Sequence, residues 1–220
     1  MPNHVTNILT FNGSTKDVED LRNAIKGIDS DGEEQAIDFS KIIPMPPELM
    51  ITSGSLVDYG IAVILFRERG DDSKLKPVLD YPWVKAENIT NAEQLANHLV
   101  ENNKADLIQG KQALDNSDKH GFKDWYTWSI ANWGTKWNAL DPYLGRCRKI
   151  NESVMQRKIR FSTAWSPPTP IILAASIAFP SIEFELCFYD ASSALQGKYV
   201  YVGGEEIHVE FRKYIGTRGG

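Results

Sequence analysis

Alternation of apolar and polar residues in three separate stretches is the feature that most constrains this fold. The segments 4–11, 158–165 and 182–189 each place mostly apolar residues at every second position, with Asn7 and Thr163 as the polar exceptions. Because successive side chains of a β-strand point to opposite faces of a sheet, this period of two predicts strands with one buried face. Burial on one side is typical of antiparallel sheets, so the three segments predict an antiparallel sheet.

Helical signals separate the predicted strands. Ser14 and Asp17 resemble a capping box, and apolar residues follow them at helical spacing. Another helix is expected after Ser166 and Pro167, which suit the N-cap and the first helical position. Further extended segments are expected at 36–43, 135–140, 197–202 and 207–211, the second of them ending at the turn signal Asp141-Pro142.

The stretch from about 45 to 120 lacks this alternation and predicts a mostly helical insertion. The apolar run 56–69 fits either a helix or a buried strand, and Thr90 with Glu93 resembles a second capping box. The order of elements predicts a single α+β domain over residues 1–220. We expect a ferredoxin-like antiparallel sheet with helices on one face and this insertion.

The composition is that of an ordinary globular chain. With 42% hydrophobic and 24% charged residues among 220, the chain can bury a core without disulfides or a metal. A net charge of −5 lacks the basic surplus of duplex-binding proteins, which disfavours nucleic acid as a partner. Cys147 and Cys187 are expected to be reduced. We expect no signal peptide, no membrane span and an intracellular location.

The sequence contains none of the common catalytic signatures. It has no phosphate-binding loop, no dinucleotide-binding glycine motif and no nucleophile elbow. The four histidines, His4, His98, His120 and His208, do not have the spacing of metal ligands. We therefore expect no cofactor, no metal site and no assigned catalytic residue.

The segment "IANWGTKWNAL" (130–140) concentrates aromatic residues, since four of the six tryptophans lie between 125 and 137. Gly134 suits the residue after a helix end. One interpretation is a packed corner that holds the helix on the sheet and pairs the indole N–H groups. The other is a binding groove. The candidate groove comprises Asn132, Trp133, Thr135, Lys136, Trp137, Asn138 and Trp165.

One basic segment lies in this acidic chain, and it flanks a predicted strand. It holds six cations within fifteen residues, against the single carboxylate of Glu152. It fits a solvated hairpin or a nucleic-acid contact, and Glu183 and Glu185 on the same sheet would repel phosphate. The candidate basic patch comprises Arg146, Arg148, Lys149, Arg157, Lys158 and Arg160.

Several motifs resemble one known family. They are "NWGTKWNA", "STAWSPP" (162–168), the opening "MPNHVTNILTF", "DFSKIIPMP" (38–46) and "FELCFYD…GKY" (184–199). Together they resemble the YubB-type family of uncharacterised phage and plasmid proteins with a ferredoxin-like domain. The resemblance implies a ferredoxin-like fold and a mobile-element origin inside bacteria. It implies no activity.

Three hypotheses about function follow. The leading one is a non-enzymatic binding protein in the cytoplasm of a bacterial host, where it modulates a host protein, for example a defence protein. The first alternative is nucleic-acid binding through the segment 146–160. The second is an enzyme that uses the aromatic groove, with Lys136 and a carboxylate such as Asp141. The sequence leaves the oligomeric state open.

Overall fold

The chain divides into two units in the computed structural model, which describes residues 3–29, 31–214 and 216. Unit 1 comprises residues 1–45 and 129–220, and unit 2 comprises residues 46–128. Unit 2 corresponds to the predicted helical insertion. Met1, Pro2 and Ser30, which belong to the predicted opening and loop segments, lie outside the described residues.

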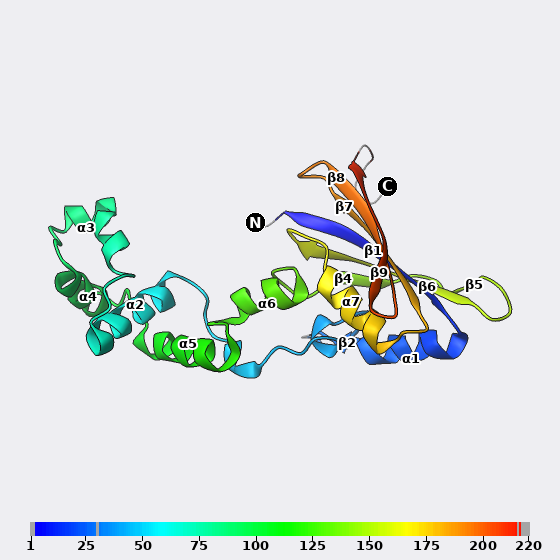
Figure 1. Ribbon diagram of the computed structural model, residues 1–220, viewed down its shortest axis with the longest axis horizontal. Coiled ribbons are helices and arrows are strands. Elements are labelled where there is room, and N and C mark those ends of the chain that lie inside the picture. Colours follow the sequence, from blue (N-terminus) through cyan, green and yellow to red (C-terminus); the bar gives the residue numbers. More distant parts are fainter. Residues whose placement is uncertain (1–2, 30, 215, 217–220) are drawn as a thin grey trace. The chain divides into compact units, whose positions relative to one another are not determined.

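Unit 1 is built on one antiparallel sheet with the strand order β4-β6-β1-β7-β8-β9, in which β5 also pairs with β6 (Figure 1). A separate two-stranded sheet joins β2 to β3. The strands are β1 (His4–Gly13), β2 (Gly27–Ile28), β3 (Glu34–Gln35), β4 (Leu140–Leu144), β5 (Arg148–Lys149), β6 (Met155–Ala164), β7 (Glu183–Asp190), β8 (Leu195–Val202) and β9 (Glu205–Lys213).

The connectivity of unit 1 is ferredoxin-like, as predicted. The elements β1, α1 (Thr15–Ile25), β4, β6, α7 (Thr169–Ala178) and β7 follow one another in the β-α-β-β-α-β order of that fold. Both helices lie on the same side of the sheet (Figure 1). We call the opposite side the open face. The hairpin β8–β9 extends the sheet beyond β7.

The predicted alternation is confirmed in the three central strands. Leu9 of β1 lies opposite Ile159 of β6 and Leu186 of β7, and all three side chains are buried. The neighbouring residue Ile8 lies opposite Arg160 and Cys187 on the open face. The two rows show that the helix-covered face holds the core of unit 1 and that the open face carries polar groups.

Two segments predicted to be extended differ in the structure. Residues 36–43 form no strand, because the Asp38 carboxylate accepts bonds from the Ser40 amide and hydroxyl and folds η1 (Phe39–Lys41) into a short 3-10 turn. The strand expected at 135–140 begins only at Leu140 and continues through Asp141 and Pro142. A bulge between Leu140 and Tyr143 accommodates the proline in this strand.

The predicted helix starts are correct at one position and wrong at two. The Ser14 side chain accepts the Asp17 amide at 3.1 Å and caps α1, as expected. Helix α7 begins at Thr169 rather than after Ser166, whose hydroxyl is bonded instead to the Gly134 carbonyl. In unit 2, Asn91 caps the helix in place of Thr90, which is bonded to the Gln94 side chain.

Unit 2 is helical throughout its regular elements, and the apolar run 56–69 is a helix. No helix in the described part of the chain is long and apolar enough to cross a membrane. The elements are η2 (Pro47–Leu49), α2 (Ser55–Arg69), η3 (Lys76–Asp80), α3 (Pro82–Ala86), α4 (Ala92–Glu101), α5 (Leu107–His120) and α6 (Trp125–Trp133), the last of which includes residues of both units.

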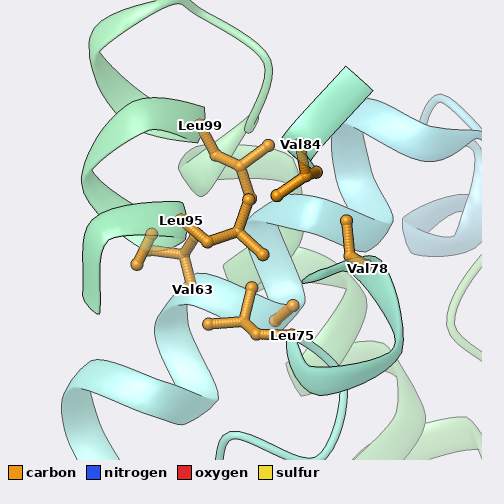
Figure 2. Close-up of a cluster of buried hydrophobic side chains, with 8 residues drawn as sticks. Val63, Leu75, Val78, Val84, Leu95 and Leu99 are labelled. Atoms are coloured by element: carbon orange, nitrogen blue, oxygen red, sulfur yellow. The ribbon is translucent and has the colours of Figure 1, made fainter. Parts of the chain in front are cut away.

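A cluster of eight buried side chains forms the main core of unit 2 (Figure 2). Leu95 and Leu99 of α4 point toward Val84 of α3 and toward α2. The helices of unit 2 are short, and short helices are marginal in isolation, so their stability depends on this packing.

We expect Leu99→Ala to lower the free energy of unfolding by about 2–5 kcal/mol, since it removes buried methyl groups and leaves a cavity. Urea unfolding followed by far-UV circular dichroism measures this change. Ile108→Ala is the control, because Ile108 is 85% exposed on α5 and its truncation leaves no cavity. Equal losses in the two variants would contradict the assignment of this core.

Candidate functional site

Trp133, the last residue of α6, packs inside unit 1. Its side chain is only 7% exposed, and its indole N–H donates to the Ile43 carbonyl at 2.9 Å. The ring meets Phe39 edge-on, with 6.0 Å between centroids. This burial fits the packed-corner interpretation, because a ligand in solution does not reach a side chain enclosed in this way.

Gly134 and Thr135 join the end of α6 to β6 and α7. Gly134 has a positive φ of 74°, and a side chain there would meet the ring of Pro170 at 2.7 Å. The buried Thr135 hydroxyl donates to the Ala164 carbonyl at 2.8 Å. The turn after α6 therefore requires glycine for both its conformation and its close contact with α7.

Asn138 anchors η1 to the corner. Its side-chain N–H donates to the Asp38 carboxylate at 2.7 Å, and its oxygen accepts the Phe39 amide at 2.8 Å. The side chain predicted to contact a ligand is thus engaged within the fold. Asp38 was not among the predicted site residues, although it begins the motif "DFSKIIPMP".

Lys136, Trp137 and Trp165 form the accessible part of the corner, which we call the Lys136 cluster. The Lys136 ammonium lies 4.6 Å from the centre of the Trp137 ring and 5.3 Å from that of Trp165. Trp165 is 44% exposed and has a positive φ of 75°. Asn132, like Lys136 and Trp137, is partly buried. Of the seven predicted groove residues, these provide the accessible surface.

The structure divides the predicted basic patch between the two faces of the sheet. Arg157 projects on the helix-covered face and forms an ion pair with Glu19 of α1 at 3.0 Å, which lowers the pKa of that carboxyl. Lys149 lies opposite Met155, which shares its face of β6 with Arg157, so Lys149 also belongs to the helix-covered face. Arg148, Lys158 and Arg160 lie on the open face and are exposed.

Tyr143 completes this part of the open face. It lies directly opposite Arg160 in the β4–β6 ladder and is 68% exposed. The exposed Arg146 follows in the loop between β4 and β5. We call Tyr143, Arg146, Arg148, Lys158 and Arg160 the basic surface. Within residues 3–29, 31–214 and 216, none of its four cations lies within 4.0 Å of a carboxylate oxygen.

The carboxylates expected to oppose phosphate lie on β7, two strands away from β6. With neighbouring strands about 4.8 Å apart, Glu185 is roughly 10 Å from Lys158 along their shared row, close to the screening length of about 8 Å at physiological salt. Glu185 also faces the Lys198 ammonium at 3.6 Å, and Glu183 accepts the Asn12 side chain at 3.0 Å. Their repulsion of a ligand at β6 is therefore weak.

A depression of about 240 Å³ on the open face over β7, β8 and β9 contains Cys187. Burial raises the pKa of the Cys187 thiol, and the negative charge of Glu185 raises it further. A thiol of this kind stays protonated at neutral pH and is a poor nucleophile. No group of three or more His, Cys, Asp or Glu side chains that could hold a metal ion occurs among the described residues.

One family model and one solved structure are similar to this chain. Residues 132–215 match the family model described as the ferredoxin-like domain in Api92-like protein. Among solved structures, the chain is similar to the protein api92 from Yersinia pseudotuberculosis, with 12% identity, a TM-score of 0.48, and coverage of 98% of this chain and 99% of that chain. No curated protein matches the chain. Residues 132–215, which lie in unit 1, are therefore similar to the ferredoxin-like domain of Api92-like proteins.

We expect Asn138→Ala to lower the free energy of unfolding by about 1–3 kcal/mol, because it leaves the Phe39 amide and the Asp38 carboxylate without this partner. Thermal unfolding followed by circular dichroism measures the loss. Lys158→Ala is the control, with an expected change within about 0.5 kcal/mol at an exposed position. If Asn138→Ala is as stable as the wild type, the corner does not depend on Asn138.

Proposed function

We propose that the protein is a non-enzymatic nucleic-acid-binding protein that contacts single strands through the basic surface. The observation that carries this proposal is the arrangement of exposed cations around an exposed tyrosine on one face of a ferredoxin-like sheet. Lys158 and Arg160 project from the same side of β6, and Tyr143 lies beside Arg160. Sheets of this kind bind RNA when aromatic side chains lie on their open face.

The chemistry of the basic surface fits an unpaired strand better than a duplex. Arg and Lys side chains bind phosphates through charge, without reading the base sequence. An exposed tyrosine ring offers a stacking surface to a base, and a base inside a duplex is already stacked. The objection from Glu183 and Glu185 loses weight, because these carboxylates lie on β7, two strands from β6, and contact Asn12 and Lys198.

The resemblance to YubB-type phage and plasmid proteins supports a setting inside a bacterial cell. In that setting, the strand bound is single-stranded DNA or RNA of the mobile element or of its host. The binding surface requires no cofactor and no membrane.

We expect the four cations of the basic surface to contact four phosphates of a single-stranded oligonucleotide. Each contact contributes about 0.7 to the salt dependence, so a plot of log affinity against log salt concentration should have a slope of about −3. Fluorescence anisotropy with an oligo-dT probe measures this slope. The double variant Lys158→Ala/Arg160→Ala removes two contacts, so we expect a slope smaller by about 1.4. Tyr143→Ala removes the stacking surface, so we expect it to weaken the binding free energy by about 1–3 kcal/mol and to leave the salt slope unchanged.

The matched control is Arg69→Ala/Lys74→Ala, which removes the same charge from exposed positions of unit 2. It is expected to keep the wild-type slope. The proposal is wrong if the wild type shows no binding at low salt, or if the control lowers the slope as much as the β6 variant does.

A protein partner is the second candidate, and the Lys136 cluster is the observation in its favour. Exposed tryptophans are over-represented where protein partners bind tightly, and Trp165 is 44% exposed beside a cation. A host protein, such as a defence protein, is the partner proposed for this surface.

We expect Trp165→Gly to abolish capture of such a partner from host lysate in an affinity pull-down, while the protein stays folded because glycine adopts a φ of 75° freely. Lys158→Ala/Arg160→Ala serves as the control, and it should retain the partner in nuclease-treated lysate. Equal recovery with the wild type and with Trp165→Gly would exclude the Lys136 cluster as the contact.

A further inference from the structure

We propose that two copies of the chain associate through their β9 strands, paired antiparallel about a two-fold axis at Val209. This inference goes beyond the proposed nucleic-acid binding and concerns the opposite edge of the sheet. Strand β9 lies at the end of the strand order, next to β8 (Figure 1). In the described part of the chain no strand pairs with its outer edge, so its outward backbone groups are open to another strand.

Apolar side chains on β9 are exposed beside this open edge. Ile207, Val209 and Phe211 are 56%, 44% and 53% exposed. Val209 lies opposite Tyr199, and Phe211 packs edge-on against Tyr199 with 5.6 Å between ring centroids. An edge strand that displays three consecutive alternating apolar residues is an unusual surface for a protein that stays monomeric.

The sequence of β9, "EEIHVEFRK", is complementary to itself when reversed. If Val209 of one copy faces Val209 of the other, Ile207 lies opposite Phe211 and His208 lies opposite Glu210 in both halves of the interface. Directly opposed residues in an antiparallel pair share a face of the sheet. The apolar residues therefore meet each other on one face, and the His208 imidazole meets the Glu210 carboxylate on the other.

Neighbouring registers lack this match. With the axis at Glu210, the two Glu210 carboxylates would oppose each other and Arg212 would face His208. With the axis at His208, the two His208 side chains would face each other and Glu210 would have no His208 opposite it. Like charges directly opposed are destabilising, which disfavours the Glu210 register, and of the three registers only that at Val209 places His208 opposite Glu210.

A bulge in β9 limits the regular part of the interface to its centre. Val200 pairs with His208 and Tyr201 with Glu206, so Ile207 is the additional residue. The Glu206 carboxylate is turned toward the Tyr201 hydroxyl, which donates to it at 3.2 Å. The central pairs at 208–210 are therefore regular, and beyond Ile207 the opposed residues of the two strands no longer share a face. This geometry predicts a dimer that dissociates on dilution.

A second copy fits this edge better than an unrelated strand does, because the pairing satisfies charge, apolar contact and two-fold symmetry at once. Rotation about an axis perpendicular to the sheet keeps the helix-covered faces of both copies on the same side. The two sheets of unit 1 then become one continuous sheet, with the basic surface of each copy at its far edges, on β4, β5 and β6.

Sedimentation velocity of the full chain over a series of concentrations tests this inference. We expect the weight-average mass to rise from 24.8 kDa toward twice that value as concentration increases. Glu210→Lys places lysine against His208 of the other copy, and His208→Glu places two carboxylates together. Each variant alone is expected to associate at least about tenfold more weakly than the wild type.

An equimolar mixture of Glu210→Lys and His208→Glu provides the decisive comparison. Within a mixed dimer the new lysine faces the new glutamate, and the remaining His208 faces the remaining Glu210, so association is expected to return. This recovery also shows that both variants are folded. Ile108→Lys, at an exposed apolar position of unit 2, is the control and is expected to associate like the wild type.

The inference is overturned if the wild type keeps a mass of 24.8 kDa at its highest soluble concentration. It is also overturned if the wild type dimerises and the two single variants dimerise equally well, because the contact would then lie elsewhere. Failure of the mixture to associate, with both variants folded by circular dichroism, would exclude the Val209 register.

Discussion

The pairing of β1 with β6 on one edge and β7 on the other determines which residues reach each face of unit 1. In this register Leu9 is aligned with Ile159 and Leu186, and Ile8 is aligned with Arg160 and Cys187. A slip of one residue would exchange the faces and expose the core row. The position of the basic surface on the open face is thus a consequence of the same register that buries the core.

The open face has two halves with different electrostatic character. Over β7, β8 and β9 the charges are paired, with Lys198 near Glu185 and Arg212 at 3.4 Å from Glu210. Over β4, β5 and β6 the cations of the basic surface have no such carboxylate partner among the described residues. A chain with a net negative charge can therefore present a local site for phosphate, since exposed charges act over about one screening length.

The sheet could be predicted from the sequence because strand alternation is a local signal that burial on one face imposes. The segment 36–43 shows where this signal fails: Ile37 and Phe39 are both buried, yet the Asp38 side chain folds the backbone into a turn. The role of Asn138 was also hidden, because its partner Asp38 lies 100 residues away in the sequence. Such contacts depend on the tertiary fold and leave no trace in local spacing.

The basic segment was visible in the sequence, but its division between two faces was not. Arg157 and Lys158 are adjacent, and only the placement of α1 shows that the first is paired with Glu19 while the second is exposed. The sequence does not link Tyr143 to the basic segment, and the β4–β6 ladder places it beside Arg160. The candidate basic patch was defined by closeness in the sequence, whereas the basic surface is defined by a shared face of the sheet.

The central claim is that the half of the open face formed by β4, β5 and β6 binds the phosphate backbone of a single strand. A backbone amide NMR titration of the full chain with an oligo-dT strand tests it most directly. We predict that the largest shifts fall within residues 143–160, with small shifts over β7, β8 and β9 and in unit 2. Shifts concentrated on β7–β9 or in unit 2, or no shifts at low salt, would contradict the claim.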